Sequence, residues 1–347
     1  MADFLIYGAY GYTGKLIAEL AVTKGYRPIL AGRQQEPLSR LAKQLDLPQE
    51  CFDLGDTARL GEVIQKTKLV MHCAGPFSDT AAPMLAACLQ HKVHYLDITG
   101  EIEVFEYIAG HDQAAKDAGI MLTPGVGFDV VPTDCLAAYL KKQLPDANSL
   151  VLAFKGANQV SRGTALTMAK NLGKGGAIRK DGQIQKVSQA FQKMKIAFNK
   201  EPQWAVTIPW GDVSTAYYST RIPNIKVFTA VNKSILRMMK ATRYLGWLLN
   251  SNPMQGWLKM RINRTITGPT VDTLAEAHSY LWGKVTNAQG EEKTARLVTP
   301  EGYRLTSLTA IAAVEKVLKG AFKPGFQTPS MAFGADFIME IEGVTRG

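Results

Sequence analysis

Residues 8–14 read Gly-Ala-Tyr-Gly-Tyr-Thr-Gly, with three glycines at intervals of three, directly after the apolar run 4–7. An amphipathic segment over 14–24 follows, so the order is strand, glycine turn and helix. In such a unit the first glycine permits a tight turn, the second admits a pyrophosphate and the third lets the helix pack on the strand. The phosphates would meet the N–H groups and the positive dipole end of the helix. The cofactor contacts predicted in this loop are Gly8, Tyr10, Gly11, Tyr12, Thr13 and Gly14.

The first 150 residues alternate short β-like runs with amphipathic segments, and several of the runs are almost entirely apolar. This alternation predicts right-handed βαβ crossovers and a parallel sheet that helices cover on both faces. The predicted strands are 4–7, 28–31, 50–53, 69–73, 94–96, 120–122 and 150–154. The predicted helices are 14–24, 36–45, 57–66, 80–91, 103–118 and 133–143.

After about residue 154 the rhythm changes to that of an α+β domain. A Lys/Gly-rich segment over 173–176 precedes further runs, a hairpin and two last helices. The runs are 204–208, 213–219 and 226–231, the hairpin strands 278–286 and 294–299, and the last helices 302–319 and 329–341. We therefore predict the α/β class, with a doubly wound parallel-sheet (Rossmann) domain that binds a dinucleotide and a second α+β domain. The predicted divisions are a dinucleotide-binding domain over 1–150, a basic α+β substrate or interaction domain over 151–300, and C-terminal helices over 301–347 that pack back on the first domain.

The end of the second predicted strand favours NADP over NAD as the cofactor. Enzymes that use NAD usually carry Asp or Glu there to bind the ribose 2′-OH, whereas this chain has Ala31-Gly32-Arg33. A guanidinium can pair with a 2′-phosphate that a carboxylate would repel, so Arg33 is the predicted ligand. Asp53, at the end of the third strand, is a candidate for the adenine edge or for a helix cap.

The loop after the fourth strand is a second candidate for cofactor binding. It reads Cys-Ala-Gly-Pro-Phe over 73–77, and a doubly wound sheet carries its cofactor across the carboxyl ends of the strands. The loop is therefore expected beneath the nicotinamide half, although a purely structural turn would have the same composition. The predicted contacts are Ala74, Gly75, Pro76 and Phe77.

The composition excludes several other classes of protein. The chain is 46% hydrophobic and 20% charged, as is usual for a globular protein. No apolar run approaches the ~20 residues that cross a bilayer, and the first residues lack the pattern of a secretory signal. Four cysteines without CxxC spacing and five histidines without HExxH lead us to expect a reducing cytoplasm and no metal site.

Five stretches occur in the order and at the separations typical of one family. They are GAYGYTGKLIAEL, AGR, CAGPF, CLQHKVHYLDITGE and PGVGFDVVPTD, which begin at residues 8, 31, 73, 88 and 124. The chain resembles the saccharopine dehydrogenase-like oxidoreductases, and more closely the branch that includes the trans-acting enoyl reductases. The resemblance covers about 1–140 strongly and returns at 325–329, Gly-Phe-Gln-Thr-Pro, which looks like the family's link into a last helix. It implies an oxidoreductase but says little about the substrate.

The resemblance also implies a substrate cleft. Residues 123–129, Thr-Pro-Gly-Val-Gly-Phe-Asp, are similar to the enoyl reductase branch and differ from saccharopine dehydrogenases proper, which puts a lysine-pathway role in doubt. By this resemblance Gly125, Gly127, Phe128 and Asp129 lie near the cofactor and the substrate.

The same strand ends supply the candidates for catalysis. Asp129 is our candidate proton donor, with solvent or a Tyr of the second domain as alternatives. Thr99 and Glu101 could equally belong to a helix start, as cap and first-turn acid, and Asp129 and Asp134 could cap the helix after Pro132. Tyr95 and Asp97 complete the polar groups at the end of the fifth strand.

The net charge of +10 is concentrated in the middle of the chain. Residues 154–271 hold 19 Lys and Arg against 3 Asp and Glu. A basic amphipathic segment over 232–250 has Lys233, Arg237, Lys240 and Tyr244 on one side and Ile235, Leu236, Met239 and Leu245 on the other, and it is followed by Trp257, Lys259, Arg261 and Arg264. Residues 233–264 could be a solvated surface helix, a helix on an anionic membrane surface, or a dock for an acidic partner such as an acyl carrier protein or a coenzyme A ester. No nucleic-acid-binding domain accompanies the charge, so nucleic acid is disfavoured.

The combined pattern predicts a cytoplasmic NADP-dependent oxidoreductase, with peripheral membrane association as an option. Its work would be to reduce a C=C, C=O or C=N bond in a small or acyl-type metabolite. One alternative is a non-catalytic NADPH-binding protein that docks to a membrane or an acidic partner. Another is an imine-reducing, saccharopine-type amino-acid dehydrogenase. Uncovered strand edges in the second domain would suit a homodimer.

Overall fold

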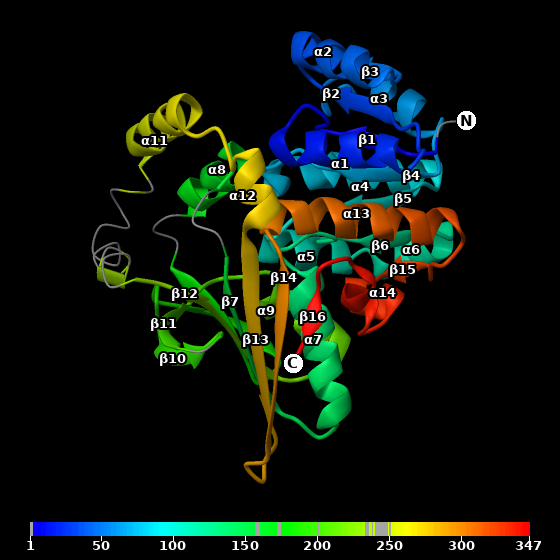
Figure 1. The fold of residues 1–347 in the computed structure, drawn as a ribbon. Helices are drawn as coiled ribbons and strands as arrows, with labels where there is room; N and C mark the ends of the chain where they lie inside the picture. Colours follow the sequence, from blue (N-terminus) through cyan, green and yellow to red (C-terminus); the bar gives the residue numbers. More distant parts are fainter. Residues whose placement is uncertain are drawn as a thin grey trace. The chain divides into compact units, whose positions relative to one another are not determined.

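The chain forms two compact units, each with its own β-sheet (Figure 1). The computed structural model describes residues 3–156, 160–171, 175–199, 201–232, 236–237, 239, 249 and 251–347. The first unit comprises residues 1–131 and 303–337, and the second comprises 132–302 and 338–347.

The first unit is built on a seven-stranded parallel sheet in the order β15-β6-β5-β4-β1-β2-β3. Its strands are β1 (Leu5–Tyr7), β2 (Ile29–Gly32), β3 (Gln49–Cys51), β4 (Leu69–His72), β5 (His94–Asp97), β6 (Met121–Thr123) and β15 (Gly325–Phe326). Leu5 in β1 pairs with Ile29 in β2 on one side and with Val70 in β4 on the other. All residues of β1, β2 and β4 are buried, as in a sheet with both faces covered. The predicted doubly wound class is confirmed, and the strand order reverses between β1 and β4, where such sheets bind ligands.

Helices follow most of these strands. They are α1 (Tyr12–Thr23), α2 (Gln35–Leu45), α3 (Thr57–Ile64), α4 (Phe77–His91), α5 (Ile102–Ala109), α6 (Asp112–Ala118), α13 (Gly302–Leu318) and α14 (Pro329–Phe333). The single helix predicted over 103–118 is wrong, because α5 ends at its C-cap Gly110 and α6 starts after His111. The helix predicted over 329–341 is also shorter, since Gly334 has a φ of +94° that ends α14.

The second unit is built on a nine-stranded mixed sheet. Its main path is β10-β11-β12-β7-β13-β14-β16, with β8 paired to β12 and to β9. The strands are β7 (Ser149–Lys155), β8 (Gly176–Lys180), β9 (Gln183–Val187), β10 (Lys193–Ala197), β11 (Pro202–Thr207), β12 (Asn224–Ala230), β13 (His278–Thr286), β14 (Glu292–Pro300) and β16 (Thr345–Arg346). The predicted hairpin is confirmed as β13 and β14.

Strand β7 belongs to this second sheet, so the prediction that 150–154 ends the first sheet is wrong. Leu152 pairs in parallel with Val227 of β12 and antiparallel with Gly283 of β13. The prediction fails because the alternation of helix and strand continues through residues 131–155, and an apolar strand is compatible with either sheet. The division between the units therefore falls after residue 131, earlier than the expected boundary at 150.

Five helices are described in the second unit: α7 (Val131–Gln143), α8 (Arg162–Asn171), α9 (Asp212–Thr220), α11 (Asn252–Thr265) and α12 (Val271–Glu276). The run 213–219 lies in α9, whereas 204–208 and 226–231 overlap β11 and β12. Burial of most of α9 outweighs the strand preference of its β-branched and aromatic residues.

Part of the basic middle segment lies outside the described residues. Lys233, Ile235, Lys240, Tyr244 and Leu245 fall there, as does the Lys/Gly-rich stretch up to Lys174. Within the ranges given above, no helix combines the length and the apolar character that a membrane crossing requires.

Candidate functional site

The glycine loop (residues 8–14) makes a tight turn against the end of β2. Gly8 has a φ of +86°, a conformation that favours glycine, and its N–H donates to the Ala31 carbonyl at 2.8 Å. The N–H of Ala9 donates to the same oxygen at 3.1 Å, and that of Gly11 donates to the Gly8 carbonyl at 3.0 Å. Helix α1 begins directly after Gly11, and no side chain of this N-cap residue closes its amino end. A helix end of this kind suits an anion.

Two further glycines make the approach between loop and helix possible. A Cβ at Gly14 would lie 2.3 Å from the Gly8 carbonyl oxygen, a distance that no side chain could adopt. A Cβ at Gly11 would lie 3.1 Å from the same oxygen, which is tight. Gly14 is buried and Gly11 is half-buried. The residues present therefore fit the pyrophosphate of a dinucleotide at the amino end of α1.

An aromatic ring and a cation lie together at the carboxyl end of β2. The ring of Tyr10 lies against Gly32, where an added Cβ would be 2.4 Å from its Cε1 atom. Arg33 comes next and is exposed, and it has no ion-pair partner among the described residues. Burial raises the pKa of the neighbouring Tyr7, the charges of Asp53 and Tyr10 add to this rise, and Arg33 opposes it. The Arg33 guanidinium is thus available to an anionic group at this strand end.

Asp53 organises a turn after β3. Its Oδ1 accepts a hydrogen bond from the Gly55 N–H at 2.9 Å. The cap of α3 is a different residue, Asp56, which accepts from the Arg59 N–H at 3.1 Å. Asp53 is exposed and remains a candidate for contact with the adenosine half of a cofactor.

The loop after β4 packs against the glycine loop. A Cβ at Gly8 would lie 2.8 Å from the Ala74 nitrogen, so the two backbones touch. The hydroxyl of Thr80 donates to the carbonyls of Ala74 at 2.7 Å and of Pro76 at 3.2 Å, and it fixes the loop from within α4. The bond between Gly75 and Pro76 is a cis peptide. Gly75 is exposed beside the glycine loop, whereas Phe77 is buried and contributes to the core.

Glu101 closes the amino end of α4. Its two carboxylate oxygens accept from the Phe77 N–H at 2.8 Å and from the Ser78 N–H at 3.1 Å. Thr99 in turn accepts from the Glu101 N–H at 3.1 Å, which holds the loop after β5 in a local turn. Glu101 is the N-cap residue of α5, but its carboxylate makes no cap hydrogen bond to that helix. The role predicted for its side chain, a first-turn acid of the helix that follows, is therefore wrong. The carboxylate ties the loops after β4 and β5 together instead.

We expect Glu101→Gln to destabilise the first unit by about 1 kcal/mol, because an amide offers one acceptor oxygen and no charge to the helix end. Urea unfolding followed by circular dichroism measures this difference. The matched control is Glu103→Gln, an exposed first-turn acid of α5, which should cost no more than about 0.3 kcal/mol because its charge is exposed to solvent. Equal stability of the two variants would contradict the role of Glu101.

Asp97 joins the ends of β5 and β6. The buried carboxyl accepts from the Tyr95 hydroxyl at 2.7 Å, from the Thr99 N–H at 2.9 Å and from the Gly125 N–H at 2.8 Å. Its backbone carbonyl accepts from the Val126 N–H at 2.8 Å. Burial raises the pKa of Asp97 to about 6, although these hydrogen bonds oppose the rise. The side chain therefore acts as a fixed acceptor that holds the loop over 124–130.

The loop over 124–130 is held on its other side by α13. Gly125 has a φ of +74°, and a Cβ there would lie 2.9 Å from the ring of Phe105. At Gly127 a Cβ would lie 2.8 Å from the Thr306 methyl group. The hydroxyl of Thr306 accepts from the Phe128 N–H at 3.0 Å. Both glycines are therefore required by packing.

Asp129, at the end of this loop, is half-buried and contacts no charged partner among the described residues. A Cβ on Gly100 would lie 2.5 Å from Asp129 Oδ2, so the carboxyl packs directly against the backbone after β5. Burial alone raises the pKa of Asp129 to about 7. A carboxyl of this kind can hold or release a proton near neutral pH, which is the property of a general acid.

The loops that follow β1, β2, β4, β5 and β6 thus all lie at the carboxyl ends of the strands of the first sheet. The residues predicted as cofactor or cleft contacts lie in these loops, at the start of the helices that follow them or, in the case of Asp53, just after β3. Asp134 differs, because it is buried within α7 of the second unit. Sequence reasoning missed Gly100 and Thr306, for which no local signal exists because their partners are distant in the chain.

The sequence of this chain is similar to a family model and to several known proteins. A family model described as the saccharopine dehydrogenase NADP binding domain matches residues 4–123. A mouse saccharopine dehydrogenase-like oxidoreductase is 26% identical over 182 residues, which cover 47% of this chain and 42% of the mouse protein. A trans-acting enoyl reductase of Mycobacterium bovis is 33% identical over 141 residues, which cover 38% of this chain and 34% of that protein. The chain thus spans less than half of the length of these two relatives.

A solved structure shares the fold over the whole chain. The apo saccharopine dehydrogenase (L-Glu forming) of Saccharomyces cerevisiae superposes with a TM-score of 0.67 at 13% identity. The match covers 100% of this chain and 99% of the yeast chain. At this identity the likeness concerns the fold alone.

Proposed function

We propose that the chain is an NADPH-dependent oxidoreductase, because the family model described as the saccharopine dehydrogenase NADP binding domain matches residues 4–123. The observation that carries the proposal is the glycine loop, where a Cβ at Gly14 would clash with the Gly8 carbonyl at 2.3 Å. This loop leads into a helix whose N-cap has no side-chain hydrogen bond, at the point where the strand order reverses.

The exposed guanidinium at the end of β2 supports NADPH over NADH as the cofactor. We expect Arg33→Ala to weaken NADPH binding about 10- to 100-fold, because one charge-assisted pair with the 2′-phosphate is lost. NADH binding should change less than about twofold. Isothermal titration of both cofactors against the wild type and the variant measures the difference. The control is Arg40→Ala, which removes an exposed cation of α2 that pairs with Glu36. An equal loss for both cofactors would contradict this role for Arg33.

The bound cofactor would supply the hydride, and the chain's own residues would position the reactants and handle the proton. Glu101 and Asp97 hold the loops after β4, β5 and β6, and so fix the edge along which the nicotinamide half would lie. Asp129 would hold a proton on its carboxyl at neutral pH and donate it to the atom that becomes electron-rich as the hydride arrives.

The bond reduced would be a C=C, C=O or C=N bond of an acyl-type or small metabolite. An enoyl reductase among the relatives favours an acyl-type substrate. Imine reduction of the saccharopine type would require several cations that converge on substrate carboxylates. The cation that we place at the end of β2, Arg33, is assigned to the 2′-phosphate of the cofactor instead.

The test is the loss of NADPH absorbance with panels of enoyl thioesters, ketones and imines. Turnover of one class identifies the reaction. NADPH binding without turnover of any class would instead support a non-catalytic protein that senses the cofactor. Failure to bind either nicotinamide cofactor would overturn the proposal.

A further inference from the structure

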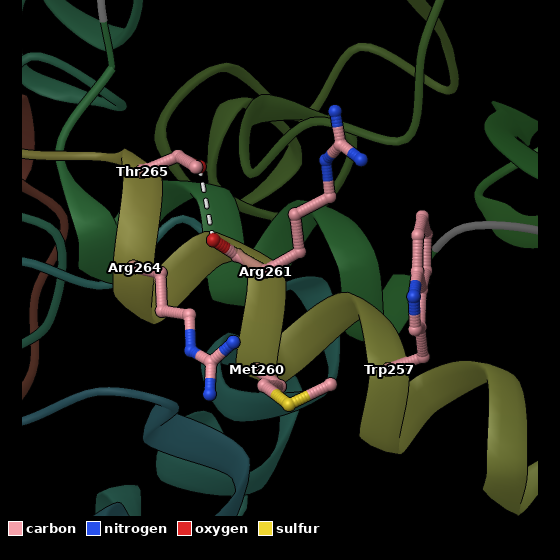
Figure 2. Close-up of a pocket in the computed structure, with 5 residues that line it drawn as sticks. All are labelled: Trp257, Met260, Arg261, Arg264 and Thr265. Carbon is pink, nitrogen blue, oxygen red and sulfur yellow. Dashed lines mark hydrogen bonds between the residues drawn. The ribbon is translucent and has the colours of Figure 1, made fainter.

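Helix α11 presents one complete face to solvent. None of its residues is buried. Figure 2 shows the side chains of this face as they project from the helix, with the Arg261 guanidinium and the Trp257 ring extending the same way. The guanidinium lies 5.5 Å from the centre of that ring. The face lines a shallow hollow of about 380 Å³ formed by Trp257, Met260, Arg261, Arg264 and Thr265.

The opposite face of α11 packs on α8 of the same unit. The side-chain amide of Gln255 donates to the Ala169 carbonyl at 3.0 Å, and the Arg162 guanidinium donates to the Ile266 carbonyl at 3.3 Å. Helix α8 therefore supports α11, and its own Met168 is 60% exposed.

Two large apolar side chains lie together in the hollow on α11. Trp257 and Met260 are each 47% exposed, and together with Met168 they make up three of the five exposed large hydrophobic side chains among the described residues. Isolated apolar side chains are normal on a protein surface, whereas a cluster marks a site of interaction. We call this cluster and the adjacent Arg261 and Arg264 the α8–α11 face.

The charge of the α8–α11 face has one sign. No Asp or Glu occurs between residues 213 and 271, nor between 155 and 180, so neither helix carries an acid. Lys259, Arg261 and Arg264 are all exposed on α11. Cations alone would suit an acidic protein equally well. The exposed Trp and Met side chains between them favour a bilayer interface, which accommodates an amphipathic ring, apolar side chains and cations at once.

We propose that the α8–α11 face docks on an anionic lipid surface, with Trp257 and Met260 entering the headgroup region and Arg261 and Arg264 contacting lipid phosphates. The docking does not depend on the oxidoreductase activity. It would hold the second unit against a membrane without any segment that spans the bilayer.

The test is co-sedimentation of the full chain with vesicles of phosphatidylcholine containing roughly 30% phosphatidylserine, against pure phosphatidylcholine. We expect binding to the anionic vesicles that weakens with added salt. Arg261→Gln with Arg264→Gln should lower the affinity on the order of 20-fold, since each cation near such a surface contributes about fivefold. Trp257→Ser with Met260→Ser should lower it by about 10-fold, and this loss should persist at high salt.

The matched control is Lys193→Gln with Lys195→Gln, two exposed cations of β10 in the same unit, which should bind vesicles as the wild type does. Circular dichroism melts establish that each variant is folded. Equal binding by the Arg261/Arg264 variant and the wild type would overturn the proposal, as would equal binding to neutral vesicles. Binding to an acidic acyl carrier protein that the same variant abolishes, without vesicle binding, would assign the face to a protein partner instead.

Discussion

Gly14→Ala should abolish measurable NADPH binding and destabilise the first unit by about 1–3 kcal/mol, the usual cost of overpacking. The added methyl group would lie 2.3 Å from the Gly8 carbonyl oxygen, so either α1 or the glycine loop must move. Movement of the loop separates the N–H groups of α1 from the pyrophosphate. Fluorescence titration with NADPH, together with urea unfolding, measures both effects.

The same substitution elsewhere in a helix provides the control. Gly256 lies in α11, where an added Cβ would meet no atom within 4 Å. Gly256→Ala should therefore stabilise α11 by about 0.5–1 kcal/mol through helix propensity and leave NADPH binding unchanged. If Gly14→Ala bound NADPH as the wild type does, the glycine loop would not be the cofactor site.

Asp129→Asn should lower kcat about 100-fold or more while it raises the stability of the first unit at pH 8. The loss of rate follows from removal of a proton donor, which typically contributes 10²–10⁴-fold. The gain in stability follows because an ionised carboxyl at this half-buried position is unfavourable, whereas an amide has no charge to bury.

The pH dependence has a definite sign. The folded pKa of Asp129, about 7, lies above the ordinary value of 3.8, so the unfolded chain loses its proton first as pH rises. The wild type therefore loses stability relative to the variant between about pH 4 and pH 7, and the difference is constant above pH 7. The upper limit is about 4 kcal/mol, reduced by solvent at a half-buried site.

Urea unfolding at pH 8 and at pH 4.5 measures this difference. The stabilisation by Asn should be large at pH 8 and small at pH 4.5. Asp117→Asn, an exposed acid of α6, should change neither rate nor stability. An Asp129→Asn variant with unchanged turnover would remove Asp129 from catalysis, whatever its stability.

The first sheet could be predicted from the sequence because its signals are local. Strands β1, β2 and β4 are short apolar runs, and the clash at Gly14 arises between residues six positions apart. The spacing of the glycines is therefore enough to predict the close approach of the loop to the helix.

The remainder of the site depends on contacts between distant residues. The carboxylate of Glu101 serves a helix that starts 24 residues earlier, and the Phe128 N–H donates to Thr306, 178 residues away. Neither contact could be predicted from the sequence, because no local pattern of residues indicates which distant residue will be the partner. The same limit explains β7, whose apolar pattern does not specify which sheet it joins.

The chain leaves the first unit after residue 131 and returns to it at residue 303, which affects the order in which the first sheet can form during synthesis. Strand β15 completes the edge of the first sheet beside β6, and its residues Gly325–Phe326 follow the whole second sheet except β16. During synthesis β15 can therefore pair with β6 only after nearly the entire polypeptide has left the ribosome. A nascent chain stopped at residue 300 would expose the free edge of β6 to chaperones or to neighbouring chains.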